Sequence, residues 1–214
     1  MKLSLSDSLR HFFKEHQILE LESLFSSQEI DLLLQELEAL QGKKTQEATD
    51  SWILRKDSWK HDEEIKKWIS SCRIGEIAAF LYQKRPIRLA YTAFLSPMQT
   101  PTFTKPLSLS EISSADPILG GALICLTGET STPLSLPHLT KQTKGSVLFF
   151  SSDHPIPFPE LFATPEQKSL LLCFIPGQAR YKLQPLDPCT HVLKKFGYAF
   201  GDLLLEAEAP YLYH

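Results

Sequence analysis

Residues 87–95 of this 214-residue chain read Ile87-Arg88-Leu89-Ala90-Tyr91-Thr92-Ala93-Phe94-Leu95, directly after Pro86. The run is rich in aliphatic and aromatic residues, and such a composition predicts a strand. Further short strands are predicted at residues 121–126, 145–151 and 169–175, with weaker ones near 132–136 and 180–183. The connections are rich in Pro, Ser and Thr, and the spacing favours an antiparallel sandwich or jelly roll over a βαβ repeat.

The chain before Pro86 is predicted to be mainly helical. Ser26 and Glu29 have the spacing of a capping box, and apolar residues then recur at helical intervals up to Leu40. Gly42 is expected to end this helix. A short strand is predicted at 18–21, a second helix from Asp62 and a third turn of helix near 75–83.

These segments together predict one domain over residues 1–214. Residues 1–85 are mainly helical, residues 86–185 form the β core, and residues 190–209 form a C-terminal helix that Gly197 and Gly201 interrupt. The fold class is therefore α+β, with helices before an antiparallel β-sandwich.

Composition excludes several classes of protein. The formal net charge is −3, the basic residues cluster only as doublets, and no basic stripe suited to nucleic acid is evident. The longest apolar runs are far shorter than the ~20 residues of a membrane-spanning helix. The four cysteines form no Cys-x-x-Cys pair, and no secretory signal is visible at the N-terminus, so we expect a cytoplasmic protein without disulfides or a cysteine-ligated zinc site.

The order of segments resembles that of phytanoyl-CoA dioxygenase-like proteins, which belong to the Fe(II)/2-oxoglutarate-dependent oxygenase superfamily. The resemblance spans about residues 10–180 and is carried by several short segments. They are His16–Leu21 with Leu24–Ile30, Gly121–Leu126, Leu136-Pro137-His138, Gly145–Phe150 with Asp153-His154, and Ser169–Ile175. The resemblance implies helices packed on a double-stranded β-helix (a jelly-roll, cupin-like fold). It also implies that chlamydial proteins of this type are relatives.

This chemistry requires two histidines and one carboxylate on one face of Fe(II), with open positions for 2-oxoglutarate and O₂. The resemblance places the His-x-Asp/Glu pair upstream of residues 121–126. The chain has Leu107-Ser108-Leu109-Ser110-Glu111-Ile112 there, with no histidine between His61 and His138. The proximal half of the iron site is therefore missing, and the chain departs from the family pattern.

The resemblance leaves His154 as the best candidate for a surviving metal ligand, with a loop histidine as the alternative. His138 is a weaker candidate, which a turn after Pro137 also explains. Lys168 stands where the family has its 2-oxoglutarate-binding arginine, so it is the candidate for the co-substrate carboxylate, although it lacks the two-point grip of a guanidinium. Arg180 would substitute only if the topology turned it inward.

One further pattern has a simpler explanation. His61-Asp62-Glu63 contains the only His-x-acid sequence, but it lies at the start of an expected helix, where residues i and i+2 face different ways. We interpret it as an exposed helix N-terminus.

Two hypotheses follow. The first is a catalytically silent relative (a pseudoenzyme) without iron or 2-oxoglutarate, which binds an unidentified small molecule or protein and neither nucleic acid nor membrane. The second is an active oxygenase with an atypical ligand set around His154, with Asp153, Glu111 or Asp116 supplying the carboxylate. The sequence leaves both open, and the first is favoured.

Overall fold

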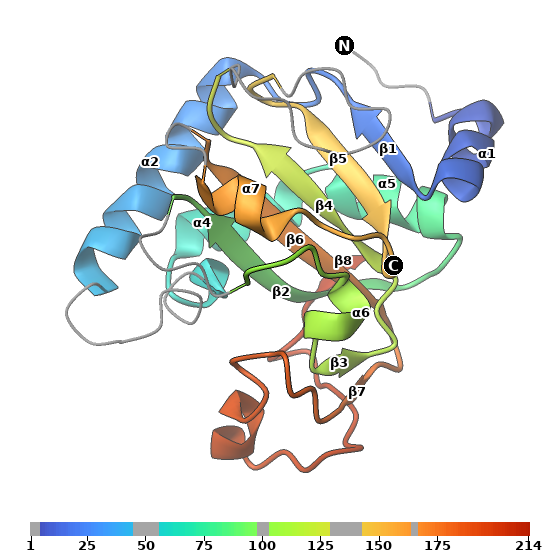
Figure 1. The fold of residues 1–214 in the computed structure, drawn as a ribbon, viewed down its shortest axis with the longest axis vertical. Helices are drawn as coiled ribbons and strands as arrows, with labels where there is room; N and C mark the ends of the chain where they lie inside the picture. The colour runs from blue at the N-terminus through green and yellow to red at the C-terminus, as the bar shows by residue number, and fades with distance from the viewer. Residues whose placement is uncertain (1–4, 45–55, 98–102, 129–142, 164–166) are drawn as a thin grey trace.

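A computed structural model describes residues 5–44, 56–97, 103–128, 143–163 and 167–214. Its main feature is a curled antiparallel sheet in which six strands follow the order β1-β5-β4-β6-β2-β8 (Figure 1). The strands are β1 (Ile18–Leu21), β2 (Ile87–Leu95), β4 (Gly120–Cys125), β5 (Val147–Ser151), β6 (Ser169–Pro176) and β8 (Tyr211–Tyr213). This architecture confirms the predicted α+β fold of jelly-roll type.

Helices cover one face of this sheet, and shorter elements lie on the other. The first group is α1 (Asp7–His16), α2 (Ser27–Lys44), α4 (Glu63–Ser71) and α5 (Ile74–Tyr82), with the 3-10 turn η1 (Ser58–Lys60) before α4. The second group is α6 (Leu109–Ile112), α7 (Phe158–Ala163) and a two-stranded sheet of β3 (Ala115–Asp116) and β7 (Arg180–Tyr181).

The alternation of side chains along β6 divides the interior into two cores. Leu170, Leu172 and Phe174 pack against the helices. Leu171, Cys173 and Ile175 face the other way, into the curled side of the sheet, which we call the barrel interior. Because neighbouring residues of a strand point to opposite faces, each residue of β6 belongs to one core or the other according to its position along the strand.

The capping box predicted before α2 is present. The carboxylate of Glu29 accepts from the backbone N–H of Ser26 (2.8 Å), and the Ser26 hydroxyl accepts from the N–H of Glu29 (3.3 Å). The expectation that Gly42 ends the helix is wrong, because α2 continues to Lys44. A glycine inside a helix costs only about 1 kcal/mol, which the packing of the preceding turns outweighs.

The predicted C-terminal helix over 190–209 is also wrong. Only the 3-10 helix η2 (Val192–Phe196) forms there, and Gly197 and Gly201 have φ values of 86° and 98°. These left-handed positions favour glycine and end helical structure. Residues 177–210, which we call the C-terminal arm, instead form a series of turns around β7 (orange to red in Figure 1).

Arg88 on β2 fixes this arm to the barrel. The guanidinium of this buried residue donates to the carbonyl oxygens of Ala209 (2.7 Å), Leu204 (2.7 Å) and Gly177 (3.0 Å). The arm is therefore an ordered part of the fold, and β8 follows it back into the main sheet.

The remaining strand predictions have different outcomes. Those at 18–21, 87–95, 121–126, 145–151 and 169–175 are confirmed to within two residues, and the one near 180 forms only the short β7. The one at 132–136 lies outside the described residues. Within the described ranges, no helix is both long and apolar enough to span a bilayer.

Candidate functional site

The structure brings together the segments that the resemblance assigns to the two halves of an iron site. Leu107 pairs with Ile156 in an antiparallel bridge. The backbone N–H of Ser110 donates to the carbonyl oxygen of Ser152 (3.1 Å), and its hydroxyl donates to Asp153 Oδ1 (2.8 Å). The segment at 107–112 therefore lies directly beside His154.

His154 itself has one unusual atom. Its Nε2 is buried and has no hydrogen-bond partner. Burial lowers the pKa of His154, so the imidazole is neutral at pH 7. A neutral imidazole nitrogen is the form that binds a metal.

The carboxylates around His154 have other roles. Asp153 holds Ser110, and Glu111 completes a capping box with Ser108 at the start of α6. Asp116 forms an ion pair with Lys182 (3.0 Å). Each of these carboxylates thus already forms a hydrogen bond or an ion pair with a nearby residue.

These residues do not fit the donor set that Fe(II) requires. Among the residues that the structure describes, no three His, Cys, Asp or Glu side chains are grouped so that they could hold a metal ion. Leu107 and Leu109, in the segment where the resemblance places the His-x-Asp/Glu pair, are buried. Leu109 and Phe150 both lie so close to Gly121 that a Cβ there would come within 2.9 Å of each, so this part of the barrel interior is filled.

Lys168 lies on the helical side of the sheet. Its ammonium pairs with Glu38 on α2, in line with its position two residues before Leu170. The buried residues Gln167 and Ser169, at the neighbouring positions, have the parity of the barrel interior. The Lys168 side chain therefore does not enter the barrel interior.

Asp62 and Arg180, which the sequence analysis also names, have structural roles. Asp62 is the N-cap of α4 and accepts from the N–H groups of Glu64 and Ile65, both at 3.0 Å, which confirms the helix N-terminus. Arg180 is exposed and donates to the carbonyl oxygen of Gly201 (2.7 Å), so it does not turn inward. His138 lies outside the described residues.

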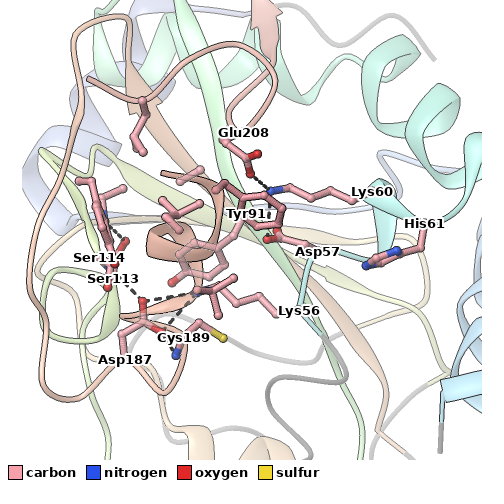
Figure 2. Close-up of a pocket in the computed structure, with 17 residues that line it drawn as sticks. Lys56, Asp57, Lys60, His61, Tyr91, Ser113, Ser114, Asp187, Cys189 and Glu208 are labelled. Atoms are coloured by element: carbon pink, nitrogen blue, oxygen red, sulfur yellow. Dashed lines mark hydrogen bonds and ion pairs between the residues drawn. The ribbon is translucent and has the colours of Figure 1, made fainter. Parts of the chain in front are cut away.

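A cavity of about 440 Å³ lies between β2, η1 and the C-terminal arm (Figure 2). We call it the arm cavity. Its charged lining residues are Lys56, Lys60, Asp57, Asp187 and Glu208, and its apolar lining includes Tyr91, Tyr181, Val192, Leu193, Phe196 and Leu204. The barrel wall and the arm thus contribute both polar and apolar groups to one space.

Lys56 and Asp187 form an ion pair within this cavity. The Lys56 Nζ lies 3.3 Å and 3.4 Å from the two carboxylate oxygens and 4.2 Å from the centre of the Tyr91 ring. The Lys56 side chain is 11% exposed and that of Asp187 is 0% exposed. Burial alone would lower the pKa of Lys56, but the charges of Asp187, Cys189 and Asp57 and the hydrogen bond to Asp187 together outweigh burial and raise the pKa, so the ammonium stays charged.

Lys56 and Asp187 differ in the lengths of the hydrogen bonds that they make. Asp187 also accepts from the backbone N–H groups of Cys189 (2.8 Å) and Ser114 (3.1 Å). Charge-assisted N–H···O bonds are normally about 2.7–2.9 Å, shorter than both contacts of Lys56. The carboxylate is therefore well coordinated, whereas the ammonium is not.

A second group of charges lies nearer the surface. Lys60 pairs with Glu208 of the arm and lies 3.8 Å from Asp57 (Figure 2). Asp57 accepts from the backbone N–H of Thr92 (3.2 Å), which ties this loop to β2. Both ion pairs thus bridge the loop before α4 and the arm.

Of the residues that line the arm cavity, the sequence patterns single out His61, which we interpret as part of an exposed helix N-terminus, but neither Lys56 nor Asp187. Lys56 and Asp187 are 131 residues apart, and neither belongs to a local motif. Tyr91 lies in a predicted strand, where its type indicates only a core position. No signal in a single sequence would have joined these residues.

Solved structures show what this fold resembles. The non-heme alpha ketoglutarate dependent carbocyclase SnoK from nogalamycin biosynthesis matches with a TM-score of 0.71 and 15% identity, over 97% of this chain and 96% of that one. The epimerase SnoN in complex with Fe3+, alpha ketoglutarate and nogalamycin RO matches with a TM-score of 0.71 and 12% identity, over 96% and 98%. CT296 from Chlamydia trachomatis matches with a TM-score of 0.53 and 16% identity, over 81% and 96%.

These likenesses show that the chain has the fold of the Fe/2-oxoglutarate-dependent oxygenases. No protein-family model and no curated protein sequence matches the chain.

Proposed function

We propose that this chain is a small-molecule-binding protein on the oxygenase fold, a silent relative of the phytanoyl-CoA dioxygenase-like proteins. The observation that carries the proposal is the position of its polar groups. A buried ammonium and a buried carboxylate line the arm cavity, whereas leucine side chains fill the barrel interior beside His154. Binding in the arm cavity needs neither Fe(II) nor 2-oxoglutarate.

The direction of Lys168 supports this proposal. Its ammonium is engaged by Glu38 on the helical side of the sheet, so Lys168 does not present its charge to a co-substrate in the barrel interior.

The size of the arm cavity also supports binding. A volume of about 440 Å³ lies within the range of pockets that take small molecules, and such pockets combine apolar walls with a few polar groups. Among the proteins of similar fold, SnoN has been solved with nogalamycin RO bound. We propose that this chain likewise holds an organic molecule.

A matched pair of variants tests this function. Leu193 lines the arm cavity, whereas Leu186 is an exposed residue of the same arm and does not line it. We expect at least one compound in a panel of small apolar molecules to raise the melting temperature, since a ligand at 100 times its Kd stabilises by about 2.7 kcal/mol. The shift should vanish in Leu193→Trp and persist in Leu186→Trp. An equal shift in both variants, or none in the parent protein, would contradict the proposal.

A second candidate function is an oxygenase with an atypical ligand set. It is favoured by one observation, the buried and unpartnered Nε2 of a neutral His154. Asp153 is adjacent and would have to release Ser110 to serve as the carboxylate. This alternative requires iron binding that depends on His154, which the silent relative does not.

A further inference from the structure

We infer that the arm cavity takes an uncharged, mainly apolar molecule whose carbonyl oxygen accepts a hydrogen bond from Lys56 Nζ. This inference rests on the proposed function and adds to it the chemical class and the orientation of the ligand.

The coordination of Lys56 calls for an added acceptor. An ammonium carries three donors. Two of them reach the oxygens of Asp187 at 3.3 Å and 3.4 Å, and among the described residues the third meets no oxygen or nitrogen acceptor, only the face of the Tyr91 ring. Nine-tenths of this side chain is buried, so bulk water does not complete its shell. A carbonyl oxygen inside the cavity would supply the missing short hydrogen bond.

The formal charges of the residues that line the cavity indicate that the ligand is uncharged. The described lining holds two ammonium groups, Lys56 and Lys60, and three carboxylates, Asp57, Asp187 and Glu208. The surplus of one negative charge opposes an anion. A cation is opposed by Lys56, which also occupies the face of Tyr91 that would otherwise attract one.

The arm supplies the apolar part of the site. Val192, Leu193, Phe196 and Leu204 line the cavity, and Phe196 on η2 is 63% exposed. An aromatic side chain that both lines the cavity and reaches solvent marks its opening as apolar. The carbonyl end of the ligand thus lies at Lys56, and the apolar body extends toward Phe196.

The test uses prodan, an uncharged naphthyl ketone whose emission responds to polarity and to hydrogen bonding at its carbonyl. We expect prodan to bind the full-length protein with a blue-shifted, brighter emission. Acetylnaphthalene, an uncharged ketone, should displace it at least tenfold more effectively than naphthoate, the matched carboxylate.

Two double variants separate the polar contact from general effects. Lys56→Met/Asp187→Asn removes both charges of the pair, so that neither is left buried alone, and should weaken prodan binding about tenfold, the effect of one lost charge-assisted hydrogen bond. The emission of the bound probe should shift further to the blue. Lys168→Met/Glu38→Gln removes a pair on the helical side and should leave binding and emission unchanged.

The outcomes are distinguishable. Prodan binding that Leu193→Trp blocks but Lys56→Met/Asp187→Asn does not weaken would overturn the inference while leaving the proposed function intact. Tighter binding of naphthoate than of acetylnaphthalene would overturn the uncharged class. No prodan binding, or binding that Leu193→Trp leaves unchanged, would count against the occupied cavity itself.

Discussion

At the scale of single residues, the Lys56–Asp187 pair combines a structural and a binding role. It joins the loop before α4 to the C-terminal arm, and both side chains are almost fully withdrawn from water. Removing one partner of a buried pair leaves the other charge uncompensated, whereas removing both charges need not destabilise a protein.

Lys56→Met should therefore lower the free energy of unfolding by about 3 kcal/mol, because Asp187 keeps only its two backbone donors. Lys56→Met/Asp187→Asn should lower it by clearly less. Urea denaturation of the parent, the two single variants and the double variant would measure this coupling. A loss in the double variant equal to the sum of the two single losses would mean that Lys56 and Asp187 make no contribution as a pair.

Glu20 on β1 gives a prediction of pH dependence. Burial raises the pKa of Glu20, the charge of Glu22 raises it further, and a hydrogen bond from Ser146 opposes both. The folded chain thus binds this proton more tightly than the unfolded chain, so its stabilising effect is present at low pH and is lost as the pH rises through the raised pKa.

Glu20→Gln should accordingly raise the melting temperature at pH 7, where the parent carries a partly buried charge. The difference should shrink as the pH falls toward the ordinary pKa of 4.5, because the parent side chain is then also neutral. Thermal unfolding followed by circular dichroism over this pH range checks it. A variant less stable than the parent at pH 7 would show that the Ser146 contact dominates.

At the scale of elements, the C-terminal arm is the part that sequence patterns describe least well. Alternation and composition predict β2 and β6, because both strands are long and apolar. The arm has no such periodicity: it is built from turns and from contacts to distant residues such as Arg88. Contacts of this kind leave no local signal in the sequence. The sequence therefore predicts a helix over residues 190–209 that does not form.

The contribution of Arg88 to this element can be measured. Arg88→Met leaves three carbonyl oxygens of the arm without their donor and should cost about 3 kcal/mol. Arg88→Lys should recover little of this, because one ammonium cannot span the three acceptors. Hydrogen exchange should accelerate at the amides of Tyr181, Gly201 and Leu204 and stay slow in β4 and β5. Uniform acceleration would instead mean that the arm unfolds only with the whole domain.

At the scale of the whole molecule, a sheet with two cores explains how the fold persists at low sequence identity. The helical core and the strand order depend on apolar alternation, which tolerates substitution, and the chain aligns with SnoK over 97% of its length at 15% identity. A metal site depends instead on a few particular side chains. The resemblance therefore predicts the fold, but not the arm cavity.

We propose that this fold works here without iron. Anaerobic calorimetry of Fe(II) binding, with and without 2-oxoglutarate, on the parent protein and His154→Ala would test this proposal most directly. We expect no binding above background for either protein, since the described side chains form no group of metal ligands. Micromolar Fe(II) binding by the parent, strengthened by 2-oxoglutarate and lost in His154→Ala, would contradict this proposal and establish the atypical oxygenase instead.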